Sequence, residues 1–278
     1  MKSFDGRVAA VTGAASGMGR YLGVRLAKRG CHVALSDVNE EGLEESARLA
    51  RAHGVKVTTQ KLDVANREAV HAWADQVVRD HGKCNAIFNN AGVGYGATAE
   101  GFDYSDMEWI FGINYWGVVY GTKAFLPYLR ASGEGHVVNT SSLFGLMAFP
   151  GQSSYNATKF AVRGFTEALR IELEITNAPV SATCVHPGGI KTNIARAARL
   201  HSSIEDLGVK NDGKSAERFE RMFRMTAEDA AETIIRGVLK NERRVLVGTD
   251  AKLYDALQRF VPGKYQWVLA KAAKRFAS

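Results

Sequence analysis

The sequence predicts an α/β fold in which a doubly wound parallel sheet of about seven strands carries helices on both faces. Two observations support this prediction. Short apolar runs rich in β-branched residues alternate with longer segments of helical period, which is typical of βαβ units and a parallel sheet. Polar residues and glycines stand where successive strands are expected to end, and doubly wound sheets bind ligands outside those ends.

The expected strands have short apolar cores that end in polar residues or glycine: 7–13, 32–38, 56–64, 84–92, 135–142, 180–189 and 243–247. The expected helices repeat their apolar residues at helical spacing: 18–29, 40–52, 67–79, 106–129, 153–175 and 227–239. With right-handed crossovers, this order gives a Rossmann fold in a single domain, 1–278. Within it, 190–225 is expected to cover the substrate as a lid, and 251–278 forms a basic C-terminal extension.

The composition describes an ordinary globular chain of 278 residues, of which 46% are hydrophobic and 23% charged. No signal-peptide core opens the sequence, and no apolar run approaches the ~20 residues that span a bilayer, so we expect a soluble, cytoplasmic protein. Cys31, Cys84 and Cys184 lie far apart without metal-ligand spacing. We therefore expect buried thiols and no metal site.

The net charge is +7, and Lys and Arg concentrate in 251–278, where four apolar side chains lie among them: Trp267, Val268, Ala272 and Phe276. A basic amphipathic helix of this kind can lie on an anionic membrane. Packing across a subunit interface, or an ordinary solvated helix, is the favoured interpretation. A nucleic-acid partner is not expected, because only the isoelectric point and the charge of the tail favour one.

The first expected strand runs into TGAASGMGR, which places Gly13, Gly17 and Gly19 between a strand and a helix. Glycine permits close backbone approach, and a helix N-terminus offers free N–H groups to a phosphate. The spacing is G-x-x-x-G-x-G rather than the common G-x-G-x-x-G, and a packing role for the glycines is the alternative. Later strand ends favour a dinucleotide site: Asp37, Asp63 with Val64, and the NNAG segment at 89–92.

Tyr155 and Lys159 are four positions apart, so both side chains share one face if the segment is helical. A free phenol has a pKa of about 10, and a nearby ammonium should lower it towards the range of a general acid or base. Ser142 ends the fifth expected strand and can hydrogen-bond a substrate oxygen, with Ser141 as the competing candidate. Asn114 is a poor helix former at an apolar site. An exposed helical pair is the alternative for Tyr155 and Lys159 taken alone.

A set of motifs resembles the ordered signature of the short-chain dehydrogenase/reductase family from about residue 5 to 192: TGAASGMG, NNAG, Asn114, Ser142, YNATK and HPGGIKT. The resemblance implies hydride transfer with a nicotinamide cofactor. It also implies a homodimer or homotetramer built on the helices around Asn114 and Tyr155. The implied catalytic residues are Asn114, Ser142, Tyr155 and Lys159. The implied cofactor-binding residues are Gly13, Ser16, Gly17, Met18, Gly19, Asp37, Asp63, Val64, Asn90, Ala91, Gly92, Tyr155, Lys159, Pro187, Gly188, Ile190 and Thr192.

The resemblance also implies a place for each part of the cofactor. The glycine loop would line the pyrophosphate, Asp37 would meet the adenosine ribose, and Asp63 with Val64 would meet the adenine. The NNAG segment would pack along the cofactor, and Thr192 would meet the carboxamide. Lys159 would also hydrogen-bond the nicotinamide ribose, and Asn114 would hold a water that connects Lys159 to solvent.

Asp37 favours NAD over NADP as the cofactor, because a carboxylate can accept hydrogen bonds from a ribose and would repel a 2′-phosphate. Family members that prefer NADP usually carry basic residues near Ser16 or just after the second strand. This chain has Ser16, Asp37 and Val38 at those places. Arg20 is the nearest base, and it falls in the first helical turn after the last glycine.

We therefore expect an NAD(H)-dependent oxidoreductase that interconverts a secondary alcohol and a ketone, with Tyr155 as general acid/base. Apolar residues near the site favour a medium-sized or hydrophobic substrate: Val93, Tyr95, Leu143, Phe144 and Phe149. The expected lid mixes two kinds of residue: the bases Arg196, Arg199, Arg218, Arg221 and Arg224, and the apolar Ile194, Leu200, Leu207, Phe219, Met222, Phe223 and Met225.

An amphipathic helix pair with its arginines in water is the simplest interpretation of the expected lid, and contact with an acidic carrier, coenzyme or lipid is the other. Two further functions stay open. The first is an NADP-dependent 3-oxoacyl thioester reductase, which the basic lid would suit and Asp37 opposes. The second is a cofactor-binding regulator without turnover, which has no need of Tyr155.

Overall fold

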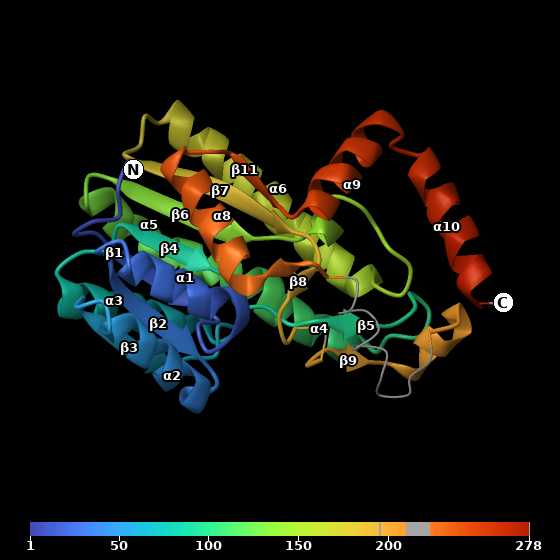
Figure 1. Ribbon diagram of the computed structural model, residues 1–278, viewed down its shortest axis with the longest axis horizontal. Helices are drawn as coiled ribbons and strands as arrows, with labels where there is room; N and C mark the ends of the chain where they lie inside the picture. The colour runs from blue at the N-terminus through green and yellow to red at the C-terminus, as the bar shows by residue number, and fades with distance from the viewer. Residues whose placement is uncertain (195, 210–222, 278) are drawn as a thin grey trace.

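A parallel sheet forms the centre of the computed structural model, which describes residues 1–194, 196–209 and 223–277 (Figure 1). The strands of this sheet are β1 Val8–Thr12, β2 His32–Asp37, β3 Val57–Lys61, β4 Ala86–Asn89, β6 Gly135–Thr140, β7 Val180–Pro187 and β11 Arg244–Val247. Within the described residues they lie in the order β3-β2-β1-β4-β6-β7-β11. The predicted seven-stranded, doubly wound sheet is confirmed, and its order reverses between β1 and β4, where such folds bind ligands.

β1 lies in the interior of the sheet and pairs in parallel with both β2 and β4. Val11 lies opposite Leu35 on one side and Phe88 on the other. All five residues of β1 are buried. A strand covered on both faces loses the polar–apolar alternation of a half-exposed strand, which explains the continuous apolar run in the sequence.

Two layers of helices cover the sheet. One layer holds α1 Gly17–Ala27, α2 Glu40–Arg51 and α8 Ala227–Leu239, and the other holds α3 Arg67–His81, α5 Gly117–Ala131 and α6 Ser153–Ile175. Each layer closes its own apolar core. The first includes Leu26 and Ile234, and the second includes Trp73 and Phe125, whose rings meet edge to face at 5.2 Å. Burying one such side chain contributes about 1.5–3 kcal/mol.

Asparagine side chains begin two of these helices. The Oδ1 atom of Asn39 accepts a hydrogen bond from the Gly42 amide at the start of α2. Asn66 caps α3 in the same way through the Ala69 amide. Each cap satisfies one unpaired amide and is worth about 1 kcal/mol. The caps fix where each helix begins, at Glu40 after β2 and at Arg67 after β3, and so limit the length of the loops at the carboxyl edge of the sheet.

The helix expected over 106–129 is interrupted by a wider turn. It consists of α4 Tyr104–Phe111, the π-helical turn η1 Gly112–Trp116 and α5. Asn114 lies inside η1 and is fully buried. A π-turn inserts one extra residue into the helix and commonly marks a functional site, and apolar spacing does not reveal it.

The segment 190–225 contains short pieces in its described parts. β8 Ile190–Lys191 pairs with β10 Met225–Thr226, β9 Arg199–Leu200 pairs with β5 Tyr95–Gly96, and the 3-10 turn η3 covers Ser202–Leu207. Four residues named for this segment lie outside the described residues: Arg218, Phe219, Arg221 and Met222. The extension at 251–278 forms most of α9 Thr249–Phe260 and α10 Lys264–Ala277.

The three cysteines are buried and free, as predicted, and burial raises the pKa of each thiol. Among the described residues, no helix is both long and apolar enough to cross a membrane.

Candidate active site

The strands of the sheet end together at one edge of the molecule, because all of them run parallel. Figure 1 shows β5, β8, β9 and α4 beyond this edge, with α9 and α10 beside them. The loops after β1, β4, β6 and β7 carry most of the residues predicted for the site.

The glycine loop after β1 packs tightly on the loop after β4. The Thr12 hydroxyl accepts hydrogen bonds from the amides of Asn90 and Ala91, at 3.0 Å each. The Asn90 side-chain amide donates back to the carbonyl of Thr12 at 3.1 Å. Gly13 has a φ of +66°, and a Cβ there would lie 2.7 Å from the Ala91 Cα. The structure thus brings together Gly13, Asn90 and Ala91, and a side chain at position 13 would force the two loops apart.

The N-terminus of α1 is left without a side-chain cap in the described chain. Ser16 occupies the capping position without a capping hydrogen bond, and the first turn of α1 holds no acidic residue. Thr192, which follows β8, approaches from the other side, since a Cβ on Gly17 would lie 3.2 Å from its methyl group. Gly17, Met18 and Gly19 therefore present a positive helix end beside the residues that follow β7, an arrangement suited to an anion.

Asp37 ends β2 beside the glycine loop. Its carboxylate accepts hydrogen bonds from the amides of Ala15 at 3.0 Å and Asn39 at 2.9 Å, which leaves acceptor capacity on both oxygens. Arg20, the nearest base, is already engaged. Its guanidinium donates to the Ala15 and Gly42 carbonyls and to the hydroxyl of Ser46.

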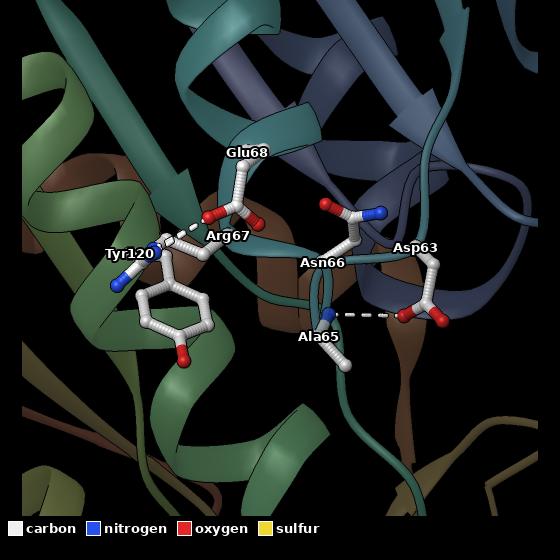
Figure 2. A pocket seen from close by; sticks show the side chains of 6 residues that line it. All are labelled: Asp63, Ala65, Asn66, Arg67, Glu68 and Tyr120. Atoms are coloured by element: carbon white, nitrogen blue, oxygen red, sulfur yellow. Dashed lines mark hydrogen bonds and ion pairs between the residues drawn. The ribbon is translucent and has the colours of Figure 1, made fainter.

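Asp63 and Val64 occupy different environments. Asp63 is exposed and its carboxylate accepts a hydrogen bond from the Ala65 amide at 2.9 Å, whereas Val64 is buried against Gly117. Figure 2 shows Asp63 across a shallow surface depression of about 460 Å³ from Tyr120. The depression is lined by Asp63, Ala65, Asn66, Arg67, Glu68 and Tyr120. None of the other predicted site residues lines it, so we do not assign it to the cofactor.

Tyr155, Lys159 and Ser142 meet at the carboxyl end of β6. Both α6 side chains are buried, and the Lys159 ammonium lies 5.6 Å from the centre of the Tyr155 ring. Lys159 donates a hydrogen bond to the Thr140 carbonyl at 3.1 Å. Ser142 hydrogen-bonds Tyr155. The alternative of an exposed Tyr155–Lys159 pair is wrong.

The pKa of Tyr155 is raised in the free protein, whereas the lowered pKa expected from the sequence depends on Lys159 together with the positive charge of an oxidised cofactor. Burial raises the pKa of Tyr155 to about 12, and the hydrogen bond with Ser142 acts in the opposite direction. Burial also lowers the pKa of Lys159 to about 8. Desolvation penalises both charged forms, so the chain by itself does not produce the acidic phenol that we predicted. The hydrogen bond with Ser142 lowers the pKa but does not offset burial, so an acidic phenol needs additional stabilisation of the phenolate.

The two neighbouring serines have different partners. The Ser141 hydroxyl donates to the Lys159 carbonyl at 2.7 Å, which ties β6 to α6. The Ser142 hydroxyl accepts from the Phe144 amide at 3.1 Å and lies at Tyr155. The Ser141 hydroxyl is therefore used in a tertiary contact, whereas the Ser142 hydroxyl lies beside that of Tyr155.

Asn114 fixes the chain after β4. Its side chain accepts from the Val93 amide at 2.8 Å and donates to the Val93 carbonyl at 2.9 Å. Gly92 lies between this pair and the ammonium, since a Cβ there would lie 3.2 Å from Asn114 Oδ1 and 3.4 Å from Lys159 Nζ. Asn114 thus holds the NNAG segment against Lys159, and only a small residue fits at position 92.

The loop after β7 is anchored by a residue that sequence reasoning missed. The Asp250 carboxylate, in the first turn of α9, accepts a hydrogen bond from the Gly189 amide at 2.6 Å, while Gly188 donates to the Val247 carbonyl at 2.9 Å. Pro187 and Ile190, on either side, are buried. The position of Asp250 near the start of a helix was the only sequence feature that could have drawn attention to it. Nothing in the sequence linked it to the loop after β7.

The expected apolar wall lies beside Tyr155. The Phe144 ring meets the Tyr155 ring edge to face at 5.6 Å, and Phe149 packs on Phe144 at 4.6 Å. Val93 and Tyr95 belong to the same apolar cluster. Two residues of the C-terminal helices were missed. Tyr254 packs on Phe149 at 5.9 Å, and the Tyr265 hydroxyl accepts from the Ala148 amide at 3.3 Å.

Comparisons with known proteins agree with this geometry. A family model described as "short chain dehydrogenase" matches residues 7–203. A protein of Mycobacterium tuberculosis named "Putative oxidoreductase SadH" is 49% identical, over 99% of this chain and 98% of its own.

Two solved structures illustrate the range of cofactors. A short chain dehydrogenase/reductase from Burkholderia phymatum in complex with NAD has a TM-score of 0.84 and 30% identity, over 94% of this chain and 95% of its own. An alcohol dehydrogenase from Thermococcus sibiricus complexed with 5-hydroxy-NADP has a TM-score of 0.71 and 26% identity, over 86% of this chain and 93% of its own.

Replacement of Gly19 by Ala should test the packing of the glycine loop. A Cβ at this position would overlap the Gly13 carbonyl oxygen, so we expect the free energy of unfolding in urea to fall by about 1–3 kcal/mol. The matched control is Gly164→Ala in α6, where a Cβ meets open space and up to about 1 kcal/mol should be gained. Equal effects of the two variants would contradict the close approach of these loops.

Tyrosinate absorbance should report the raised pKa of Tyr155. In the free protein, the wild-type minus Tyr155→Phe difference should show no ionisation of this phenol below about pH 11, since its pKa is raised to about 12. Because that value lies above the unfolded value of about 10, Tyr155 favours the folded state below pH 10, and this contribution is lost as the pH rises towards 12. A midpoint below 10 in the free protein would overturn this description of the site.

Proposed function

Since the chain belongs to the short chain dehydrogenase family and is an oxidoreductase of that family, we propose that it is an NAD(H)-dependent enzyme that interconverts a secondary alcohol and a ketone. One observation carries the proposal. The buried Tyr155 hydroxyl lies beside Ser142 and one helical turn from Lys159, at the sheet edge that also bears the uncapped N-terminus of α1. A protein that only binds a cofactor has no need of this arrangement.

The residues present fit a dinucleotide. The amides of Gly17, Met18 and Gly19, with Gly13 and Ser16 before them, would hold the pyrophosphate, because this helix end has neither a cap nor an acid in its first turn. The side-chain oxygen of Asn90 supports the same assignment, since it is buried without a partner in the described chain.

We propose the remaining contacts with the dinucleotide in the order of the strands that carry the residues. Asp37 would meet the adenosine ribose, and Asp63 with Val64 would meet the adenine. The NNAG segment would pack along the cofactor, and Lys159 would hydrogen-bond the nicotinamide ribose. The nicotinamide end would meet four residues after β7: Pro187, Gly188, Ile190 and Thr192.

The chemistry supplied by bound nicotinamide is hydride transfer to or from the substrate carbon. Tyr155 gives its proton to the substrate oxygen during reduction and takes it back during oxidation. Ser142 hydrogen-bonds the same oxygen and stabilises the charge that develops there. Lys159, with a pKa of about 8, stays mostly protonated near neutral pH and supplies a positive charge to the phenol.

Asn114 would assist proton return through a water between Lys159 and solvent. It anchors Val93 through both side-chain atoms, so its position is fixed. Each unit by which the Tyr155 pKa must fall requires about 1.4 kcal/mol of preferential phenolate stabilisation. The positive charge of Lys159 and that of the oxidised cofactor act in this direction.

NAD is the proposed cofactor because of the charge around Asp37. A 2′-phosphate would meet this carboxylate, and the nearby Arg20 is committed to backbone carbonyls and Ser46. The alternative, an NADP-dependent 3-oxoacyl thioester reductase, would need a free base at this place. Arg20 could serve only by giving up these bonds.

The substrate is proposed to be a medium-sized or hydrophobic alcohol or ketone. Support comes from the aromatic wall of Phe144 and Phe149 beside Tyr155. The segment 190–225 would act as the lid. We further propose that the protein is a cytoplasmic homodimer or homotetramer. It would act on a small-molecule alcohol or ketone and would need neither a metal ion nor a nucleic-acid partner. Exposed Trp116 and Phe160, near Asn114 and Tyr155, suit such an interface.

Replacement of Tyr155 by Phe should separate catalysis from binding. The ring and its packing on Phe144 remain and only the ionisable hydroxyl is lost, so we expect kcat to fall at least 10²–10⁴-fold. NADH affinity, measured by fluorescence titration, should change by less than a few-fold. Tyr128→Phe is the control, because that hydroxyl bonds Asp75 at the surface. Normal turnover in the Tyr155 variant would refute the assignment.

Replacement of Asp37 by Asn should relax the choice of cofactor. The amide can still accept a hydrogen bond from Ala15, but the negative charge is lost, so we expect NADP to gain on NAD by roughly 10-fold or more in kcat/KM. Asp63→Asn is the matched control, since Asp63 lies just after β3 and its carboxylate also accepts an amide two residues ahead. Its proposed contact with the adenine is common to both dinucleotides, so the NAD/NADP ratio should not change. An unchanged NAD/NADP ratio in the Asp37 variant would remove the argument for NAD.

A further inference from the structure

The C-terminal helices α9 and α10 form an arm with an inner and an outer face. Figure 1 shows the arm extending from the end of β11 along the side of the molecule where β5 and β9 lie. Tyr254 of α9 packs on Phe149, and Tyr265 of α10 is buried and bonds Ala148. These two residues fix the arm to the loop that carries the aromatic wall of the site.

The outer face of the arm exposes large apolar side chains. Leu253 and Phe260 lie two turns apart on α9 and are 66% and 86% exposed. Trp267 and Val268 on α10 are 66% and 50% exposed. Trp267 and the buried Tyr265 are two positions apart, so they lie on opposite sides of α10. Trp267 is therefore exposed because the whole face of the helix that carries it is turned to solvent.

The charges of the arm are divided between the same two faces. Both acidic residues face inward: Asp250 accepts from the Gly189 amide, and Asp255 is buried against Arg244 and Arg259. Four lysines are exposed, and within the described chain no carboxylate pairs with any of them: Lys252, Lys264, Lys271 and Lys274. The Lys271 ammonium lies 5.0 Å from the centre of the Trp267 ring. The outer face is therefore both apolar and cationic.

We propose that the outer face of α9 and α10 docks on an anionic lipid surface. Lysines around an exposed Trp and Phe match the headgroup region of such a surface, where the aromatic rings enter the interface and the ammonium groups meet phosphates. A second copy of the chain is a poorer match, because pairing two such faces would oppose lysine to lysine. The proposal does not depend on the oxidoreductase reaction.

Vesicle co-sedimentation, without dinucleotide or substrate, tests the proposal. We expect the full chain to bind vesicles of mixed phosphatidylglycerol and phosphatidylcholine, and to bind pure phosphatidylcholine far more weakly. Lys264→Gln with Lys271→Gln should weaken anionic binding roughly 30-fold, on the basis of about 1 kcal/mol for each lysine near the surface. Phe260→Ser with Trp267→Ser should weaken the binding that remains at high salt.

Matched controls distinguish the arm from the net charge of the protein. Lys28→Gln with Lys123→Gln removes the same charge from exposed sites on α5 and beside α1, and Ile175→Ser removes an exposed apolar side chain from α6. These variants should bind as the wild type does. Circular dichroism and the urea midpoint check that each variant is folded.

Three results would overturn the proposal. The first is absence of wild-type binding to the anionic vesicles. The second is equal loss of binding in the arm variants and in their controls. The third is a molar mass, measured by light scattering, that equals that of a monomer in the Phe260/Trp267 variant but not in the wild type or the other variants. That result would make the outer face a contact between subunits.

Discussion

The burial of a phenol next to an ammonium is the constraint on which this site depends. Desolvation moves the pKa of Tyr155 up to about 12 and that of Lys159 down to about 8, so near neutral pH a protonated phenol lies beside an ammonium that is still mostly charged. For Tyr155 alone, a rise of two units from 10 corresponds to about 3 kcal/mol against the phenolate. The phenol of the free protein is therefore a weak acid, and under the proposed function the positive charge of the oxidised cofactor would couple proton transfer to cofactor binding.

The sequence predicted the parallel sheet and the cluster at its carboxyl edge because both follow from local patterns. Gly13, Gly17 and Gly19 mark a strand-to-helix turn, and Tyr155 and Lys159 share a helix face by spacing alone. The partners of these residues come from distant parts of the chain. Ser141 and Ser142 could be distinguished only when the structure placed the backbone carbonyl of Lys159 next to the Ser141 hydroxyl.

The parts that sequence reasoning missed depend on tertiary contacts. Asp250 reaches Gly189 across 61 positions, and Tyr265 reaches Ala148 across 117, so no local pattern could indicate either bond. The raised pKa of Tyr155 in the free protein was not foreseen for a related reason. Spacing reports the neighbouring charge, but the desolvation that outweighs it depends on what the whole fold places over the pair.

The C-terminal helices contact both the loop after β6 and the loop after β7, which are also joined directly by the hydrogen bond between His186 Nδ1 and the Ser142 carbonyl. Through Asp250 they fix the loop that follows β7, and through Tyr254 and Tyr265 they fix the wall beside Tyr155. A displacement of the arm would therefore disturb the loop after β7 and the aromatic wall beside Tyr155 together.

The pairing of β1 with β4 also has a consequence for how the chain acquires its shape. Val11 pairs with Phe88 only across three strand–helix–strand connections, through α1, α2 and α3, and the main sheet, whose pairs are all parallel, contains no hairpin to nucleate it. Folding rates fall as such sequence separations grow. Newly made chains should therefore pass through collapsed states with unpaired strand edges, and production of the protein should be limited by aggregation at that stage rather than by the stability of the finished molecule.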